Sequence, residues 1–140
     1  MRYDEMHVDG GTASQVFLYP ADLDWKLVVQ KFEVKGTVKA YVIRNSFLKP
    51  DWETVHPKIL PIAGVSISSL IRTQGIWDMH RIYLDCQRDG IDYNLAYIPG
   101  DFDLKPKEDF DPVYMSKLFD LGYELAVNAY PWDKGPPGFE

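Results

Sequence analysis

The chain has 140 residues, the size of a single domain, of which 46% are apolar and 26% are charged. These proportions exclude a disordered or fibrous chain. The 15 basic and 21 acidic residues give a net charge of −6, which argues against a nucleic-acid binder. The stretch from Lys26 to Lys49 contains six basic residues, one of them Arg44, and a single acidic residue, Glu33. We interpret them as a solvated face, with an anionic lipid surface as the alternative.

The number of cysteines and the length of the apolar runs exclude further classes of protein. Cys86 is the only cysteine, so neither an intramolecular disulfide nor a thiolate metal cluster is expected. No uninterrupted apolar stretch approaches the ~20 residues of a membrane-spanning helix, and no signal-peptide pattern follows Met1. Phosphate-loop and dinucleotide-binding motifs are absent from the sequence, which therefore predicts no cofactor.

The first part of the chain alternates apolar runs with turn signals. Met6–Val8 is predicted to be a strand that runs into a tight loop at residues 9–11, and Val16–Tyr19 is a second extended segment. A helix is expected over Asp22–Phe32, followed by a buried strand at Ala40–Arg44.

The middle of the chain contains the longest helical pattern. Ile59–Ala63 is a short apolar run broken by Pro61, so any strand there would be very short or at an edge. Ser66–Asp89 has helical spacing, and its two apolar stripes are offset across Gly75, where we expect a kink or a break.

The last part begins with a strand at Ile91–Ile98 and continues with a helix capped by Asp111 and Pro112. Gly122 lies on the apolar face of that helix and predicts a close approach to its neighbour. The Pro- and Gly-rich segment 131–140 is expected to wrap the surface. Strands that alternate with helices indicate the α/β class.

The strongest candidate for chemistry is Asp9, followed by Gly10 and Gly11. The bare tripeptide is a turn signal, but here it ends an apolar strand, and the carboxyl ends of strands are where α/β folds build their sites. A carboxylate there can act as a general base toward a hydroxyl nucleophile. His7 would point to the same face of the strand, where a packed neutral histidine is favoured over a metal ligand.

A second candidate is the segment Gly64–Ser68, which resembles a nucleophile elbow around Ser66. Ser68 stands where the elbow requires glycine, so a helix N-cap role for Ser66 is favoured. His56 and His80 are interpreted as surface or core polar residues. The acid-rich run from Asp101 to Asp111 does not match a calcium loop and is interpreted as a solvated linker.

Several segments in order resemble the C-terminal half of bacterial patatin-like phospholipases. The resemblance is carried by Glu5–Gly11, Gln15–Pro20, Tyr41–Asn45, Leu70–Gln74, Asn94–Pro99, Tyr130–Trp132 and Pro136–Gly138. It implies a three-layer α/β/α fold with a mostly parallel sheet, and lipid acyl-ester hydrolysis by a Ser–Asp dyad. Asp9 matches the aspartate of that dyad, and Gly10 and Gly11 complete its motif. The implied partner is a lipid or acyl-ester substrate at a membrane surface, with no metal or cofactor.

In that family the nucleophilic serine and the oxyanion loop precede the Asp-Gly-Gly motif, whereas only eight residues precede Asp9 here. We therefore expect residues 1–140 to be the C-terminal portion of one patatin-like domain whose N-terminal half is missing. Such a chain would be inactive alone, and either marginally stable or self-associated through an exposed apolar face. The alternatives are a non-catalytic binding remnant and a self-contained hydrolase that uses Ser66.

Overall fold

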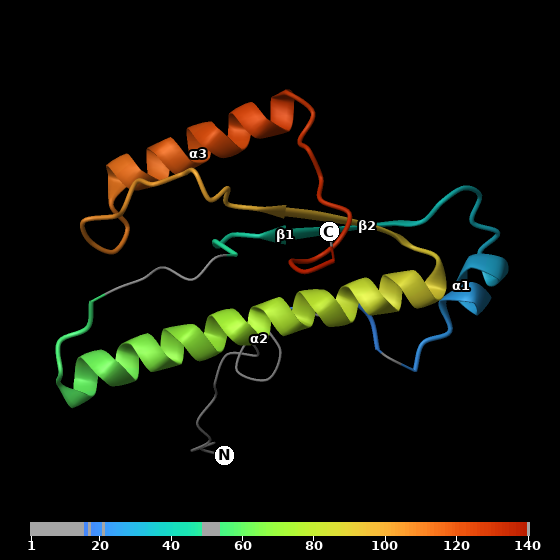
Figure 1. The fold of residues 1–140 in the computed structure, drawn as a ribbon. Coiled ribbons are helices and arrows are strands. Elements are labelled where there is room, and N and C mark those ends of the chain that lie inside the picture. Colours follow the sequence, from blue (N-terminus) through green and yellow to red (C-terminus); the bar gives the residue numbers. More distant parts are fainter. Residues whose placement is uncertain (1–15, 17, 21, 49–53, 140) are drawn as a thin grey trace, which may run out of the picture.

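A computed structural model describes residues 16, 18–20, 22–48 and 54–139. The elements in chain order are α1 (Trp25–Lys31), β1 (Lys39–Arg44), α2 (Ile59–Asp89), β2 (Asp92–Tyr97) and α3 (Pro112–Val127). The strands β1 and β2 pair in parallel, and α2 and α3 lie on opposite sides of them (Figure 1). The chain is thus a mixed α/β structure with a parallel sheet, which confirms the expected class at this level.

The core lies where the second half of α2 packs against the two strands. It consists of Ala40, Val42, Met79, Ile82, Cys86, Ile91, Tyr93 and Leu95. Ala40 and Val42 alternate with exposed residues along β1, whereas four consecutive residues of β2 are buried. Because burial disfavours the thiolate, the pKa of Cys86 is raised to about 11, and the thiol serves packing.

Local signals explain where α2 begins and ends. Pro61 occupies its first turn, where the missing N–H costs no helical hydrogen bond. Gly90 ends the helix in the left-handed conformation, with a φ of 72°, and its N–H bonds to the carbonyl of Cys86. The short edge strand expected at Ile59–Ala63 is therefore wrong, and α2 continues through Gly75 without the expected break.

The other elements follow the sequence more closely. Asp24 caps α1, which is shorter than the expected helix, and Asp111 accepts hydrogen bonds from the N–H groups of Val113 and Tyr114 at the start of α3. β2 lies within the expected strand and α3 within its pattern, while β1 begins one residue before the expected strand and ends with it at Arg44. The described residues of the segment 16–19 form no strand, and residues 6–8 lie outside the described residues.

The C-terminal segment closes one side of the sheet. Leu95 and Asp133 exchange two backbone hydrogen bonds, of 2.9 and 3.1 Å. Lys134 binds the carboxylate of Asp92 at 2.8 Å, while Pro136 is fully buried. This segment therefore occupies the edge of β2 that faces away from β1, as the expectation of a surface wrap suggested.

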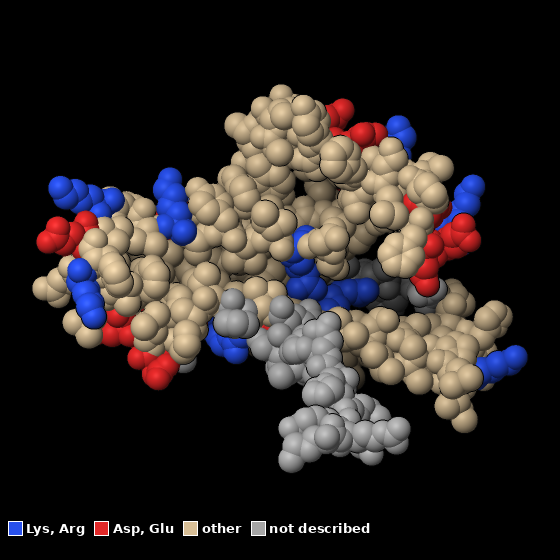
Figure 2. Space-filling model, turned by 180° about the vertical axis from the view of Figure 1, so that it is seen from behind, with Lys and Arg blue, Asp and Glu red and all other residues tan. Residues whose placement is uncertain are grey.

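The first half of α2 is exposed along its whole circumference. Every residue from 59 to 71 is exposed, and Ile59, Leu60 and Leu70 keep 86%, 83% and 70% of their surface. Seen from behind, this half projects from the body as an almost uncharged rod (Figure 2). One 18-residue window of α2 has a mean hydropathy of 1.3, enough by length and composition to cross a membrane. A core helix of a soluble protein can have the same length and hydropathy, so these two properties alone do not assign α2 to a membrane.

A polar cluster attaches the segment before α1 to the end of α2. The hydroxyl of Tyr19 donates to Asp89, whose carboxylate also binds the guanidinium of Arg88 at 2.8 Å. These two partners lower the pKa of Asp89 to about 2, Arg88 contributing first. Burial and the neighbouring carboxylate raise the pKa of Tyr19 to about 12.

Leucine side chains are buried in β2 but exposed in the first half of α2, so a change from leucine to alanine should have unequal effects in the two places. Leu95→Ala removes a fully buried side chain and should lower the free energy of unfolding by about 2–5 kcal/mol. Leu60→Ala, at a residue that is 83% exposed, should change it by less than about 0.5 kcal/mol. Urea denaturation of both variants checks the difference, and equal losses would show that Leu60 is covered in solution.

The Asp89 cluster predicts a pH dependence. Because the folded pKa lies near 2 and the ordinary value is 3.8, the ionised carboxylate stabilises the fold above pH 4. This contribution is lost as the pH falls from about 4 toward 2. The advantage of the wild-type chain over Asp89→Asn should therefore shrink between urea denaturation at pH 5 and at pH 3. Asp120→Asn, at an exposed acid of α3, should show no such change.

Candidate functional site

The residues assigned to the dyad motif, Asp9, Gly10 and Gly11, lie outside the described residues, as does His7. The chain that follows the motif is fixed to α2 through Val16. Its N–H donates to Asp78 Oδ2 at 3.2 Å, and its carbonyl accepts from Arg81 Nη2 at 3.0 Å. Asp78 is buried and pairs with Arg81 at 3.3 Å.

An apolar cavity of about 650 Å³ separates α3 from the carboxyl ends of the strands. Leu118, Leu121 and Leu125 face it from α3, and all three are half-buried. No residue of α3 is fully buried. The remaining wall is formed by Ile43, Arg44, Asn45, Ala96, Tyr97, Ile98, Pro99, Gly122, Ala126, Ala129, Tyr130 and Trp132. The volume and the apolar walls suit a small ligand.

A second cavity, of about 410 Å³, lies on the α2 side of β1. It shares Ile43, Arg44 and Asn45 with the first cavity, so the two adjoin at the end of β1. Its other lining residues are Val16, Val42, Ser46, Ser68, Ile71, Arg72 and Met79. It therefore combines two arginines with two hydroxyls and one amide.

The arginines of this second cavity were not identified as functional from the sequence, where Arg44 was placed on a solvated face. The structure corrects that interpretation, because Arg44 is only partly exposed and its Nε is buried. Burial and the neighbouring charge of Arg72 both lower the pKa of Arg44. The sequence did contain one signal for this burial, because Arg44 is a basic residue at the end of a strand that was predicted to be buried.

The possible nucleophile elbow is not formed. Gly64–Ser68 lies inside α2 and is fully exposed, whereas an elbow requires a sharp turn between a strand and a helix. The N-cap role favoured for Ser66 is also wrong, because α2 begins at Ile59. Ser66 therefore has no surroundings that would activate it among the described residues.

The described histidines serve packing or face solvent. His80 contacts the carbonyl of Ile76 at 2.9 Å and that of Pro137 at 3.0 Å, which holds the C-terminal segment on α2. His56 is exposed. In the described part of the chain, no group of three His, Cys, Asp or Glu side chains could hold a metal ion.

Comparisons with known proteins give no match: no family model, no curated protein and no solved structure is similar to this chain.

Gly122 tests whether α3 is packed closely. A Cβ added there would meet no described atom within 4 Å, so the close approach expected from the sequence is not formed. Gly122→Ala should therefore raise the free energy of unfolding by about 0.5–1 kcal/mol, through helix propensity. Gly90→Ala, at a φ of 72°, should lower it by about 1 kcal/mol. A destabilised Gly122→Ala in thermal denaturation would mean that α3 lies against a close neighbour.

Proposed function

We propose that this chain acts as the C-terminal part of a patatin-like serine acyl hydrolase, in which Asp9 is the general base of a Ser–Asp dyad. Gly10 and Gly11 support the motif, and the nucleophilic serine and the oxyanion loop come from a segment that precedes it. In this proposal β1 and β2 belong to a larger, mostly parallel sheet within a three-layer α/β/α fold. The residues of the resemblance suggest the family.

The observation that carries the proposal is the exposure of the first half of α2. A helix at the surface of a protein normally buries one apolar stripe and presents a polar face, whereas a helix that is apolar all round is buried, in the core of a large protein or in a membrane. Residues 59–71 carry no charge and are all exposed. They therefore call for further layers of structure around them, as the proposed fold would provide.

The edges of the sheet support the same proposal. The outer edge of β2 is closed by the bridge to Asp133, whereas β1 pairs, among the described residues, with β2 alone. Exposed strand edges favour pairing with a further strand. Additional strands of a parallel sheet would then lie beside β1 and cover the exposed half of α2.

The proposed chemistry follows from the dyad. The serine hydroxyl transfers its proton to the Asp9 carboxylate and attacks the ester carbonyl, while backbone N–H groups stabilise the oxyanion. Asp9 then returns the proton to the leaving alcohol, and an acyl-enzyme forms. Asp9 then takes a proton from water, which attacks the acyl-enzyme, and returns that proton to the serine oxygen as the bond to the acyl group breaks and the fatty acid leaves.

The DNA that precedes the codon for Met1 provides the first test. We expect an in-frame Gly-x-Ser-x-Gly motif with a glycine-rich stretch before it. In the protein expressed from that longer frame, Asp9→Asn should reduce ester hydrolysis at least 100-fold while the far-UV circular dichroism is unchanged. Asp22→Asn, at an exposed acid, is the control. An unrelated upstream sequence, or an Asp9→Asn variant within a few-fold of wild type, would contradict the proposal.

A non-catalytic binding module is the second candidate, favoured by two adjoining cavities whose lining needs no nucleophile. It predicts that the chain neither hydrolyses esters nor reacts with a fluorophosphonate probe, in the longer frame as in the 140 residues. Labelling of Ser66 would instead support a self-contained hydrolase.

A further inference from the structure

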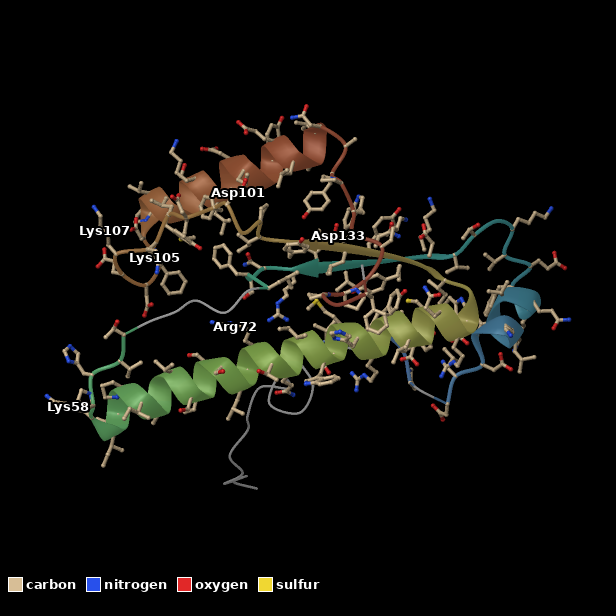
Figure 3. All side chains as sticks on the ribbon, viewed as in Figure 1. Lys58, Arg72, Asp101, Lys105, Lys107 and Asp133 are labelled. Atoms are coloured by element: carbon tan, nitrogen blue, oxygen red, sulfur yellow. The ribbon has the colours of Figure 1, made fainter. Side chains whose placement is uncertain are left out.

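Two arginines meet at the end of β1, and neither has an acidic partner in the part of the chain that the structure describes. Arg44 is the last residue of β1, and its Nη2 donates to the backbone carbonyl of Arg72 in α2 at 3.5 Å. Arg72 projects from the middle of α2 below the strands (Figure 3). Among the described residues neither guanidinium forms an ion pair. Two like charges thus lie close together, which costs energy unless an anion joins them.

The hydrogen bonds of Arg44 are incomplete. Its Nε is buried and has no partner among the described residues. A buried donor that is left unpaired destabilises a protein, and more strongly when the group is charged. The guanidinium has five N–H donors in a fixed fork, a geometry that matches a carboxylate or a phosphate. The unpaired donor therefore calls for an oxyanion.

The surroundings of the pair are polar without being acidic. Asn45, Ser46 and Ser68 line the same cavity of about 410 Å³, and none of its described lining residues is Asp or Glu. The sequence from residue 54 to residue 77 contains no acid at all. The amide and the hydroxyls can donate further hydrogen bonds to an anion bound between the arginines.

The neighbouring cavity provides room for an apolar chain. It begins at the residues shared with the arginine cavity and continues under α3 along Leu118, Leu121 and Leu125. Trp132 also lines it. A ligand that spans both cavities would need an anionic head and an apolar tail.

We propose that Arg44 and Arg72 bind the oxyanion head group of a single-chain amphiphile, a fatty carboxylate or an alkyl phosphate, whose chain lies in the cavity under α3. The site goes beyond the proposed function, since neither the general base Asp9 nor the nucleophilic serine of the dyad is assigned to it. A fatty carboxylate is also the product of the proposed hydrolysis. The two proposals nevertheless fail separately, because Asp9→Asn should abolish turnover of the longer protein and leave this binding unchanged.

Isothermal titration calorimetry of the 140-residue chain tests the site with four probes below their micelle concentrations. Dodecanoate and dodecyl phosphate should bind. Dodecyltrimethylammonium, which has the same chain and the opposite charge, should bind at least tenfold more weakly. Inorganic phosphate, which has no chain, should also bind at least tenfold more weakly than dodecyl phosphate. Equal binding of the cation would overturn the head-group assignment, and equal binding of inorganic phosphate would overturn the place of the chain.

Substitutions locate the two ends of the ligand. Arg44→Gln and Arg72→Gln should each weaken dodecanoate binding at least tenfold, whereas Lys117→Gln, at an exposed base of α3, should leave it unchanged. Wild-type affinity in both arginine variants would contradict the proposal. Photo-crosslinking locates the apolar end of the ligand in the wild-type chain. Dodecanoate with a diazirine at its terminal carbon should label the segment 118–125. Labelling confined to the exposed half of α2 would overturn the site.

Discussion

The packing of two parallel strands on the second half of α2 is the contact on which the rest of the structure depends. Cys86 and Leu95 are completely buried in it, with Met79 and Ile82 beside them. Because the strands are parallel and in register from Lys39 and Asp92 onward, their carboxyl ends lie at the same end of the sheet. Both cavities adjoin at that end, so the arginine pair and the apolar space under α3 exist only while this core is formed.

The two halves of α2 contribute unequally to the core. The second half of the helix buries its apolar side chains against the sheet, whereas equally apolar residues of the first half stay in water. Removing apolar surface from water stabilises a protein by roughly 25 cal/mol per Å², so side chains such as Ile59 and Leu70 represent stabilisation that is not realised in this chain. The helix is therefore better suited to a larger core than to the one described.

The sequence predicted elements whose signals are local and failed where tertiary packing decides. Asp111 and Pro112 specify the start of α3 by capping, and alternation or apolar runs specify β1 and β2. The expectation at Pro61 was wrong because, in sequence, a proline in the first turn of a helix resembles one that breaks a strand. Arg44 was missed because its charge alone predicts solvent, while its burial depends on the Arg72 carbonyl across the fold.

The candidate base and the arginine pair are linked through Val16. This residue lines the arginine cavity, and Asp78 and Arg81 hold its backbone on α2. Asp9 precedes Val16 by seven residues, a length of chain that spans at most about 25 Å. An ester hydrolysed at Asp9 would therefore release its fatty carboxylate within that distance of Val16, which lines the cavity of the two arginines. The carboxylate is the group that such a pair of guanidinium ions is suited to receive, so hydrolysis and anion binding would be successive steps in one region of the protein.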